Sequence, residues 1–374
     1  MSLESGLLRS WPDGGPKELW KTSAIGNGYC SPIIVDDTIY VTGDIEDELM
    51  VFALKPDGNI KWRTPNGFSW TQSFPGSRAS CNYSNGKLYN VNAFGRLLCL
   101  SAADGKPIWS VRLLEKYQSR GEAWGIIEMV VIDDNAVYAS INGAKGLVVA
   151  LDKDTGEEIW STDNSTEDDY TYSSPILATV NGRRQVISCG NKNAYGVDVK
   201  TGKLLWSFPH EYRGRMVAPM PTFADGALFV TNSKPGDESV TYRLDFKDGK
   251  VKKGWQESLG TSTCGGIVVH KGVAYGSRPR KGTGFIGIDA KSGELLFNKE
   301  DIKESSVIFG DDRIYCQASK GTIYLLESGK NDFVVRGELS IGNVKDFWAH
   351  PVIAGGKLYL RYGNTLYCHD IRRN

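Results

Sequence analysis

Histidine and cysteine, the side chains that most often bind metals or act as nucleophiles, are few and scattered in this chain. The four histidines, His210, His270, His350 and His369, form no His-Glu-x-x-His motif and no pair at metal-ligand spacing. No Gly-x-Ser-x-Gly motif is present. The seven cysteines include no Cys-x-x-Cys motif, which excludes a zinc cluster and c-type haem attachment. We expect the cysteines to be buried free thiols on separate strands, without disulfides.

One glycine motif has the spacing of a dinucleotide-binding loop. Residues 282–287 match Gly-x-Gly-x-x-Gly. That fingerprint needs a strand before it and a helix after it, because the helix N-terminus meets the pyrophosphate. Here residues 285–289 have the pattern of a strand, so we interpret the match as coincidental.

Overall composition narrows the class of protein. The formal net charge is +0, so no general affinity for nucleic acid or an anionic membrane is expected. No apolar run approaches the roughly 18 residues of a membrane span. With 43 glycines and 11% aromatic residues, the sequence combines many turns with many strand formers, which is typical of all-β proteins.

A short sequence motif recurs along the whole chain, and its repetition predicts the fold. An apolar strand is followed by Asp or a similar residue, a Gly turn, and a second strand that ends in Trp. The copies repeat at roughly 40–50 residues, which is the period of propeller blades. A degenerate copy ends near Val334, and a half copy precedes Trp20. The positions equivalent to the terminal Trp are Trp20, Trp62, Trp109, Trp160, Trp206, Trp255 and Phe297.

A second phrase alternates with the first and predicts a hairpin in each repeat. It begins with residues 31–41, a strand, a polar turn and another strand, and it returns in every later repeat. Together the two phrases predict a single domain, residues 1–374, folded as an eight-bladed β-propeller with four-stranded blades. The last blade has three strands of its own, so we expect the strand at Leu19–Trp20 to complete it and close the ring.

The phrase Leu-Asp-x-x-Thr-Gly-x-x-x-Trp, preceded by a Ser-Pro strand, resembles the repeat of the pyrroloquinoline-quinone (PQQ)-like propeller family. That family includes quinoprotein alcohol and sugar dehydrogenases, and the chain looks most like its BamB-like members. The resemblance implies that the repeat tryptophans pack between blades. It also implies an exported protein of the bacterial periplasm or cell envelope, whose signal peptide is missing here, and members of this group are often lipid-anchored.

The resemblance leaves two functions open. The first is a non-catalytic scaffold that binds a ligand or a protein. The second is a sugar or alcohol dehydrogenase that uses PQQ with Ca²⁺. The adjacent cysteine pair that quinoprotein dehydrogenases place beside PQQ is missing, and no Ca²⁺ ligand set can be assigned. Glu122, Glu128, Asn343 and Asp346 lie near blade entrances, where solvated loop residues are expected.

The candidate binding site lies in the segments that lead into the inner strands. In a propeller these segments come from distant parts of the chain and meet around the central channel. Aromatic rings and Arg suit a protein partner or a small polar ligand, such as a sugar or a carboxylate. The alternative is that these side chains only seal the channel. We expect a monomer whose site contains Trp70, Arg78, Trp124, Arg215, Trp348 and His350.

Overall fold

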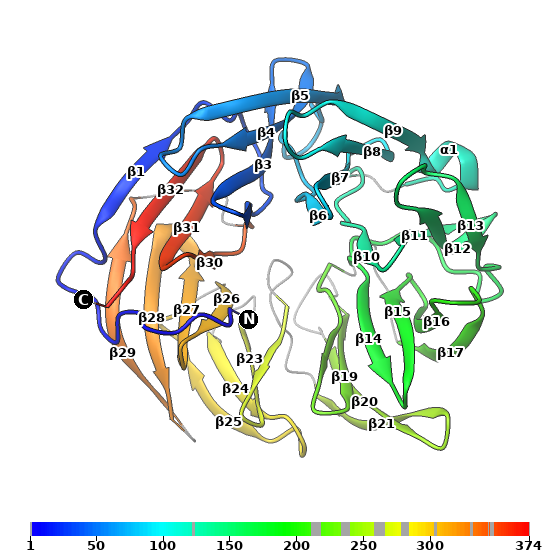
Figure 1. The fold of residues 1–374 in the computed structure, drawn as a ribbon. Coiled ribbons are helices and arrows are strands. Elements are labelled where there is room, and N and C mark those ends of the chain that lie inside the picture. Colours follow the sequence, from blue (N-terminus) through cyan, green and yellow to red (C-terminus); the bar gives the residue numbers. More distant parts are fainter. Residues whose placement is uncertain are drawn as a thin grey trace.

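The computed structural model describes residues 2–121, 124–210, 218–232, 240–257, 266–277, 284–302, 305–329, 332–342, 344 and 348–373. In this part of the chain, the strands form eight sheets of four strands each, arranged as a ring (Figure 1). The predicted all-β eight-bladed propeller is therefore confirmed.

The blades follow one another along the chain. Blades 1 and 2 contain β2 (Ile33–Val35), β3 (Thr38–Ile45), β4 (Glu48–Leu54), β5 (Ile60–Phe68), β6 (Asn82–Ser84), β7 (Lys87–Val91), β8 (Arg96–Ser101) and β9 (Pro107–Arg112). Blades 3 and 4 contain β10 (Val131–Asp133), β11 (Ala136–Gly143), β12 (Gly146–Asp152), β13 (Glu158–Ser161), β14 (Ile176–Val180), β15 (Arg183–Cys189), β16 (Asn193–Asp198) and β17 (Leu204–Pro209).

The second half of the ring repeats this plan. Blades 5 and 6 contain β18 (Thr222–Ala224), β19 (Ala227–Asn232), β20 (Val240–Lys247), β21 (Lys250–Glu257), β22 (Val268–His270), β23 (Val273–Ser277), β24 (Phe285–Asp289) and β25 (Leu295–Lys299). Blades 7 and 8 contain β26 (Ser305–Gly310), β27 (Arg313–Ala318), β28 (Thr322–Ser328), β29 (Phe333–Ser340), β30 (Val352–Ala354), β31 (Lys357–Tyr362), β32 (Thr365–Asp370) and β1 (Glu18–Thr22).

Helical structure is limited to two short elements among the described residues. Helix α1 (Leu113–Tyr117) follows β9, and the 3₁₀ turn η1 (Ser319–Gly321) precedes β28. No described helix has the length and apolarity to cross a membrane. The Gly282–Gly287 motif runs into strand β24, as the sequence predicted, and residues 282–283 lie outside the described part.

The ring closes by pairing the two ends of the chain. Strand β1 pairs antiparallel with β32, with Trp20 opposite Cys368 (Figure 1). The segment before β1 is also built into the fold, since the Leu8 amide donates to the Ile371 carbonyl at 2.8 Å. The predicted closure by an N-terminal outer strand is confirmed. It removes the two free sheet edges that an open ring would expose.

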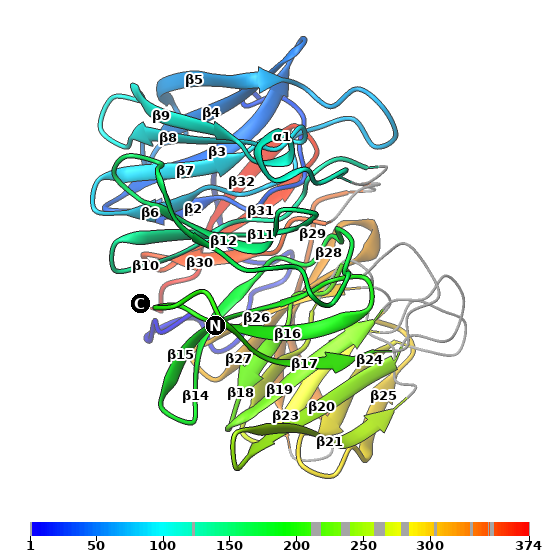
Figure 2. The ribbon, with the colours of Figure 1, turned by 90° about the vertical axis from the view of Figure 1, so that its right-hand side faces the viewer.

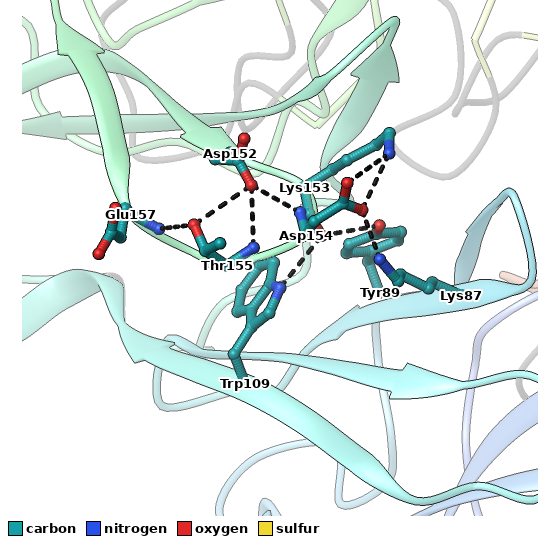
Figure 3. A network of polar contacts seen from close by, with 8 residues as sticks. All are labelled: Lys87, Tyr89, Trp109, Asp152, Lys153, Asp154, Thr155 and Glu157. Atoms are coloured by element: carbon teal, nitrogen blue, oxygen red, sulfur yellow. Dashed lines mark hydrogen bonds and ion pairs between the residues drawn. The ribbon is translucent and has the colours of Figure 1, made fainter.

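Most repeat tryptophans pack their blade against the next one. Trp109 Nε1 and the Tyr89 hydroxyl both donate to the Lys153 carbonyl of the following blade, each at 3.0 Å (Figure 3). The packing role implied by the repeat is therefore present. Trp206 differs, because its indole donates to Gln185 of its own blade. The other indole donors to a neighbouring blade are Trp20, Trp62, Trp160 and Trp255.

The Asp-x-x-Thr-Gly turn forms the surface against which the indole of the preceding blade packs. Asp152 Oδ1 accepts the backbone N–H groups of Asp154 and Thr155, at 2.8 and 2.9 Å (Figure 3). Gly156 follows with a left-handed φ of +75°, and a Cβ there would lie 2.7 Å from the Trp109 ring. Glycine is thus required both by its backbone conformation and by the close approach of the indole.

Blade 7 has no repeat tryptophan, and Trp11 from the N-terminal segment occupies that position. The degenerate repeat places Gly337, not a residue near Val334, at the position equivalent to Trp109, because Gly337 pairs with Leu325. Trp11 covers Gly337 and lies 6.0 Å from the Tyr315 ring, as Trp109 lies 5.9 Å from Tyr89. The N-terminal segment therefore supplies both the missing strand of blade 8 and the missing indole of blade 7.

The thiols conform to the sequence prediction in the described residues. Cys30, Cys81, Cys99, Cys189, Cys316 and Cys368 are all buried and free, while Cys264 lies outside the described part. Burial raises the pKa of several of these thiols, to about 12 for Cys189 and Cys316, so they stay protonated at neutral pH. They act as small apolar side chains between strands.

Candidate functional site

The two faces of the ring differ in what they carry. We call the side where the chain enters the inner strands the loop face, and the opposite side, with the short hairpin turns, the turn face. Figure 2 shows the ring from its side, with the connection after β5 projecting from one face and the β14–β15 hairpin extending on the other. The predicted site residues that the structure describes precede inner strands and therefore belong to the loop face.

Aromatic rings from five entry segments form a continuous series across the loop face. Tyr29 and Trp348 have ring centroids 4.7 Å apart, and Trp348 lies 4.9 Å from Phe74. Phe74 in turn lies 6.5 Å from Trp124, which stacks on Tyr172 at 5.3 Å. We call these five residues the aromatic series. They lie in the segments that enter blades 1, 8, 2, 3 and 4, so the series connects segments from five adjacent blades of the propeller.

Phe74 is the central and most exposed member of the series. Its side chain is 46% exposed, and its backbone has a left-handed φ of +55°. Such a conformation is uncommon for a residue with a bulky side chain and persists only where the surroundings enforce it. Arg78 Nη2 donates to the carbonyls of Ser73 and Phe74, at 3.0 and 2.9 Å, and Trp70 Nε1 donates to Ser73 at 3.0 Å. These bonds fix the loop at Ser73 and Phe74 in a conformation that leaves the Phe74 ring partly exposed to solvent.

Arg78 is turned inwards, beneath this loop. Its guanidinium lies over the buried Trp70 ring, 5.3 Å from the centroid, in a cation–π contact. Burial lowers the pKa of Arg78, but an arginine remains cationic at neutral pH. Two of its bonds support the Phe74 loop, so its main task here is to position that loop rather than to reach solvent.

A carboxylate that the sequence did not single out lies beneath the same loop. Neither carboxylate oxygen of Asp44, at the end of β3, accepts a hydrogen bond within the described residues. Burial raises the pKa of Asp44 to about 7. The backbone N–H of Trp70 and the guanidinium groups of Arg361 and Arg78 lower the pKa of Asp44 and so act in the opposite direction. Asp44 therefore changes charge near neutral pH.

Arg361 is a buried residue at the contact between the first and last blades. It is 1% exposed, and its guanidinium donates to the carbonyls of Cys30, Thr42 and Gly26 and to Cys30 Sγ. These bonds join β31 to the segment that enters blade 1. Their acceptors are neutral, so the charge of Arg361 is balanced only at longer range, in part by Asp44.

The structure brings four of the six predicted residues together, namely Trp70, Arg78, Trp124 and Trp348. His350 has an exposed side chain, and its backbone exchanges hydrogen bonds with the Ser31 hydroxyl at 2.8 and 3.0 Å. Arg215 lies outside the described residues.

The remaining groups with potential chemistry are structural or lie outside the described part. His210 and His369 are buried, each ring contacts a backbone carbonyl, and burial lowers the pKa of both. Glu128 is buried rather than solvated, contrary to expectation, and Glu122, Asn343 and Asp346 lie outside the described residues. Within the described residues, no three His, Cys, Asp or Glu side chains gather as a metal site.

Sequence reasoning missed Phe74, Asp44 and Arg361. Phe74 had a usable signal, because an aromatic residue directly before Pro75-Gly76 interrupts a polar loop. Asp44 and Arg361 had none, since each sits within a strand and its surroundings form only when distant segments fold over it.

Comparisons with known proteins agree with the repeat. The family model described as outer membrane protein assembly factor BamB matches residues 51–234. Tetrathionate hydrolase of Acidithiobacillus ferrooxidans is 21% identical over 92% of this chain and 64% of its own length. The dehydrogenase subunit of a quinone alcohol dehydrogenase from Komagataeibacter europaeus is 28% identical over 39% of this chain and 22% of its own. BamB of Yersinia pestis is 23% identical over 58% of this chain and 56% of its own.

The matches to these three relatives cover less than two thirds of each relative's length. Among solved structures, BamB from Moraxella catarrhalis superposes with a TM-score of 0.69 at 14% identity, covering 95% of this chain and 99% of that one. Quinohemoprotein alcohol dehydrogenase from Comamonas testosteroni gives 0.64 at 13% identity, covering 99% and 77%. Likeness at this level of identity shows a shared fold.

Proposed function

Because the chain carries the repeat of the PQQ-like propeller family, we propose that it is a non-catalytic scaffold of the bacterial cell envelope that binds a protein partner at its loop face. The observation that carries this proposal is the aromatic series, in which Phe74 stays 46% exposed between Trp124 and Trp348. Aromatic side chains on rigid supports supply much of the energy at protein interfaces.

The geometry favours an apolar or aromatic partner side chain over a carboxylate. Arg78, the described cation of the predicted site, is committed to the Ser73 and Phe74 carbonyls and to the Trp70 ring. The rings of Phe74 and Trp348 offer faces and edges that prefer tilted contacts with other rings. The relatives named as outer membrane protein assembly factors support a role in binding other proteins in the envelope.

The enzymatic relatives define the competing function. Asp44, a carboxylate beside the site, does not suit Ca²⁺, because the charges of Arg78 and Arg361 next to it oppose a bound cation. A non-catalytic scaffold would show neither dehydrogenase activity with a quinone nor hydrolysis of tetrathionate, so either activity would contradict the proposal.

The test measures enzymatic activity and peptide binding on the same purified protein. Purified protein supplied with PQQ and Ca²⁺ is assayed for dye reduction with alcohols and sugars, and separately for consumption of tetrathionate. We expect no rate above the blank in either assay. In parallel, tryptophan fluorescence follows titration with a strand-length peptide that alternates aromatic and polar residues, and with a control in which Ser replaces the aromatic residues. We expect the aromatic peptide alone to bind.

Turnover in either assay would overturn the proposal, as would equal binding of both peptides. Phe74→Ala is expected to weaken binding of the aromatic peptide roughly thirtyfold, as at an interface hot spot. Phe68→Ala is the matched control, because Phe68 is also exposed, at 75%, but lies outside the aromatic series.

A further inference from the structure

A hollow on the turn face of blade 4 is lined mainly by basic residues. Its volume is about 540 Å³, and it opens between the turn joining β14 to β15 and the turn joining β16 to β17. Figure 2 shows the β14–β15 hairpin extending on the side away from the connection after β5. The hollow is therefore separate from the aromatic series. Its basic lining residues are Arg183, Arg184, Lys200 and Lys203.

The charges of this hollow are only partly balanced. Arg184 Nε pairs with Asp133 Oδ2 at 2.6 Å. Asp198 Oδ1 accepts the backbone N–H groups of Lys200 and Thr201, at 3.0 and 2.9 Å, and so is used by its own turn. Within the described part of the chain, Arg183, Lys200 and Lys203 form no ion pair. Four cations thus face two carboxylates, and the hollow keeps a clear excess of positive charge.

The fold does not require these cations. In blades 3, 4 and 6 the same turn is shaped by an Asp that accepts two backbone N–H groups, through Asp152, Asp198 and Asp289. The residues around that Asp vary freely in charge. The positions of Lys200 and Lys203 hold Asp154 and Glu157 in blade 3, and Lys291 and Glu294 in blade 6. The same turn therefore forms with acidic or basic residues at these positions, so its geometry does not require the basic residues of blade 4.

We propose that this hollow binds a phosphate monoester through Arg183, Lys200 and Lys203. Such a group carries about two negative charges near neutral pH, which matches the uncompensated charge of the hollow. Arg offers a planar fork of donors and Lys a compact charge, a combination that suits phosphate oxygens. The volume exceeds that of phosphate alone, so part of the attached molecule enters as well. The phosphate can belong to a soluble ester or to a lipid headgroup.

The experiment uses the full chain and two probes. Calorimetric titration with inorganic phosphate tests the shared chemistry. Co-sedimentation with phosphatidylcholine vesicles, with and without phosphatidic acid, tests the lipid source. We expect phosphate to bind, and the variant Arg183→Ala/Lys200→Ala/Lys203→Ala to lose at least about tenfold in affinity, since each charge-assisted bond contributes to binding. Binding only to vesicles with phosphatidic acid, or only to soluble phosphate, supports the site and identifies its source.

The matched control is Lys291→Ala, an exposed lysine at the equivalent position of blade 6. It should bind both probes like the wild type, and a Lys200→Arg/Lys203→Arg variant should retain binding because it keeps the charge. Circular dichroism checks that the triple variant is folded. Failure of wild type to bind either probe would overturn the proposal, as would binding that survives the triple variant or is equally lost in Lys291→Ala. Phe74→Ala should leave this binding unchanged, which separates this proposal from that for the loop face.

Discussion

Two sets of tryptophans in this molecule have opposite surroundings. A repeat tryptophan such as Trp109 donates its Nε1 hydrogen to the next blade and lies flat on Gly156 of that blade. A loop-face tryptophan such as Trp348 instead touches Tyr29 and the exposed Phe74. Residue type alone therefore does not distinguish a tryptophan that packs between blades from one that is available to bind a partner. What separates them is whether the ring's contacts are completed by the neighbouring blade or remain open beside an exposed ring.

The largest expected effect comes from removing a repeat tryptophan together with its strand. Deletion of residues 2–22 takes away β1, Trp20 and the Trp11 ring that covers blade 7. We expect Tm to fall by more than about 10 °C and the protein to aggregate, because β32 of blade 8 gains an open edge and blade 7 loses its covering indole. Scanning calorimetry and light scattering give the answer. Wild-type melting of a monomeric deletion variant would refute the closure.

Single repeat tryptophans should come next. Trp109→Ala and Trp11→Ala should each lower the free energy of unfolding by about 3 kcal/mol, since each removes an indole between blades. Urea unfolding measures this. Trp348→Ala should lower it by about 1 kcal/mol or less, because its neighbours are loop rings. Equal losses at Trp109 and Trp348 would erase the distinction between the two sets.

Two glycine variants separate backbone strain from contact with the indole. Gly156→Ala places a Cβ 2.7 Å from the Trp109 ring, whereas Gly182, with a similar φ of +77°, has nothing within 4 Å. We expect Gly182→Ala to lose about 1 kcal/mol through its left-handed φ alone, and Gly156→Ala to lose about 2 kcal/mol. Paired denaturation curves give the difference. A difference of zero would mean that the ring moves aside freely.

A smaller effect concerns pH on the loop face. The pKa of Asp44 is raised in the folded state to about 7, so the native state binds an extra proton between about pH 4 and 7. This contribution to stability is fully present at acidic pH and is lost as pH rises through 7. A shift of this size corresponds to about 4 kcal/mol, which solvent screening of the partly exposed Asp44 reduces, so Asp44→Asn should be more stable than wild type by at least about 1 kcal/mol at pH 8 and by almost nothing at pH 4.

Unfolding of Asp44→Asn and wild type across this pH range, with Asp198→Asn on the turn face as a contrast, measures the effect. A wild-type profile that is parallel to that of Asp44→Asn at all pH values would show that Asp44 does not titrate as described.

The fold was predictable because its information is local and repeated. Each Asp-Gly or Thr-Gly turn and each terminal Trp recurs in register, so blade number and the closing strand at Trp20 follow from the sequence. The role of Trp11 could not be predicted, because only the strand pairing shows that Gly337 occupies the position of a repeat tryptophan and is covered by Trp11.

The site was only partly predictable, for a similar reason. Entry segments bring Trp70, Trp124 and Trp348 together by topology, which the repeat already implies. The outward ring of Phe74 depends on a left-handed φ, and the inward turn of Arg78 depends on which carbonyls that loop presents. These are consequences of one loop conformation, and no periodicity in the sequence encodes it.

The central claim, that the loop-face rings bind a partner while the repeat rings hold the blades, is tested most directly by measuring binding and stability on the same two variants. Phe74→Ala and Trp109→Phe are each titrated with the alternating aromatic peptide and unfolded in urea. We predict that Phe74→Ala loses roughly thirtyfold in affinity with nearly unchanged stability, and that Trp109→Phe loses stability with unchanged affinity. Unchanged affinity of Phe74→Ala, with a loss of stability, would contradict the account and make the aromatic series a seal of the channel.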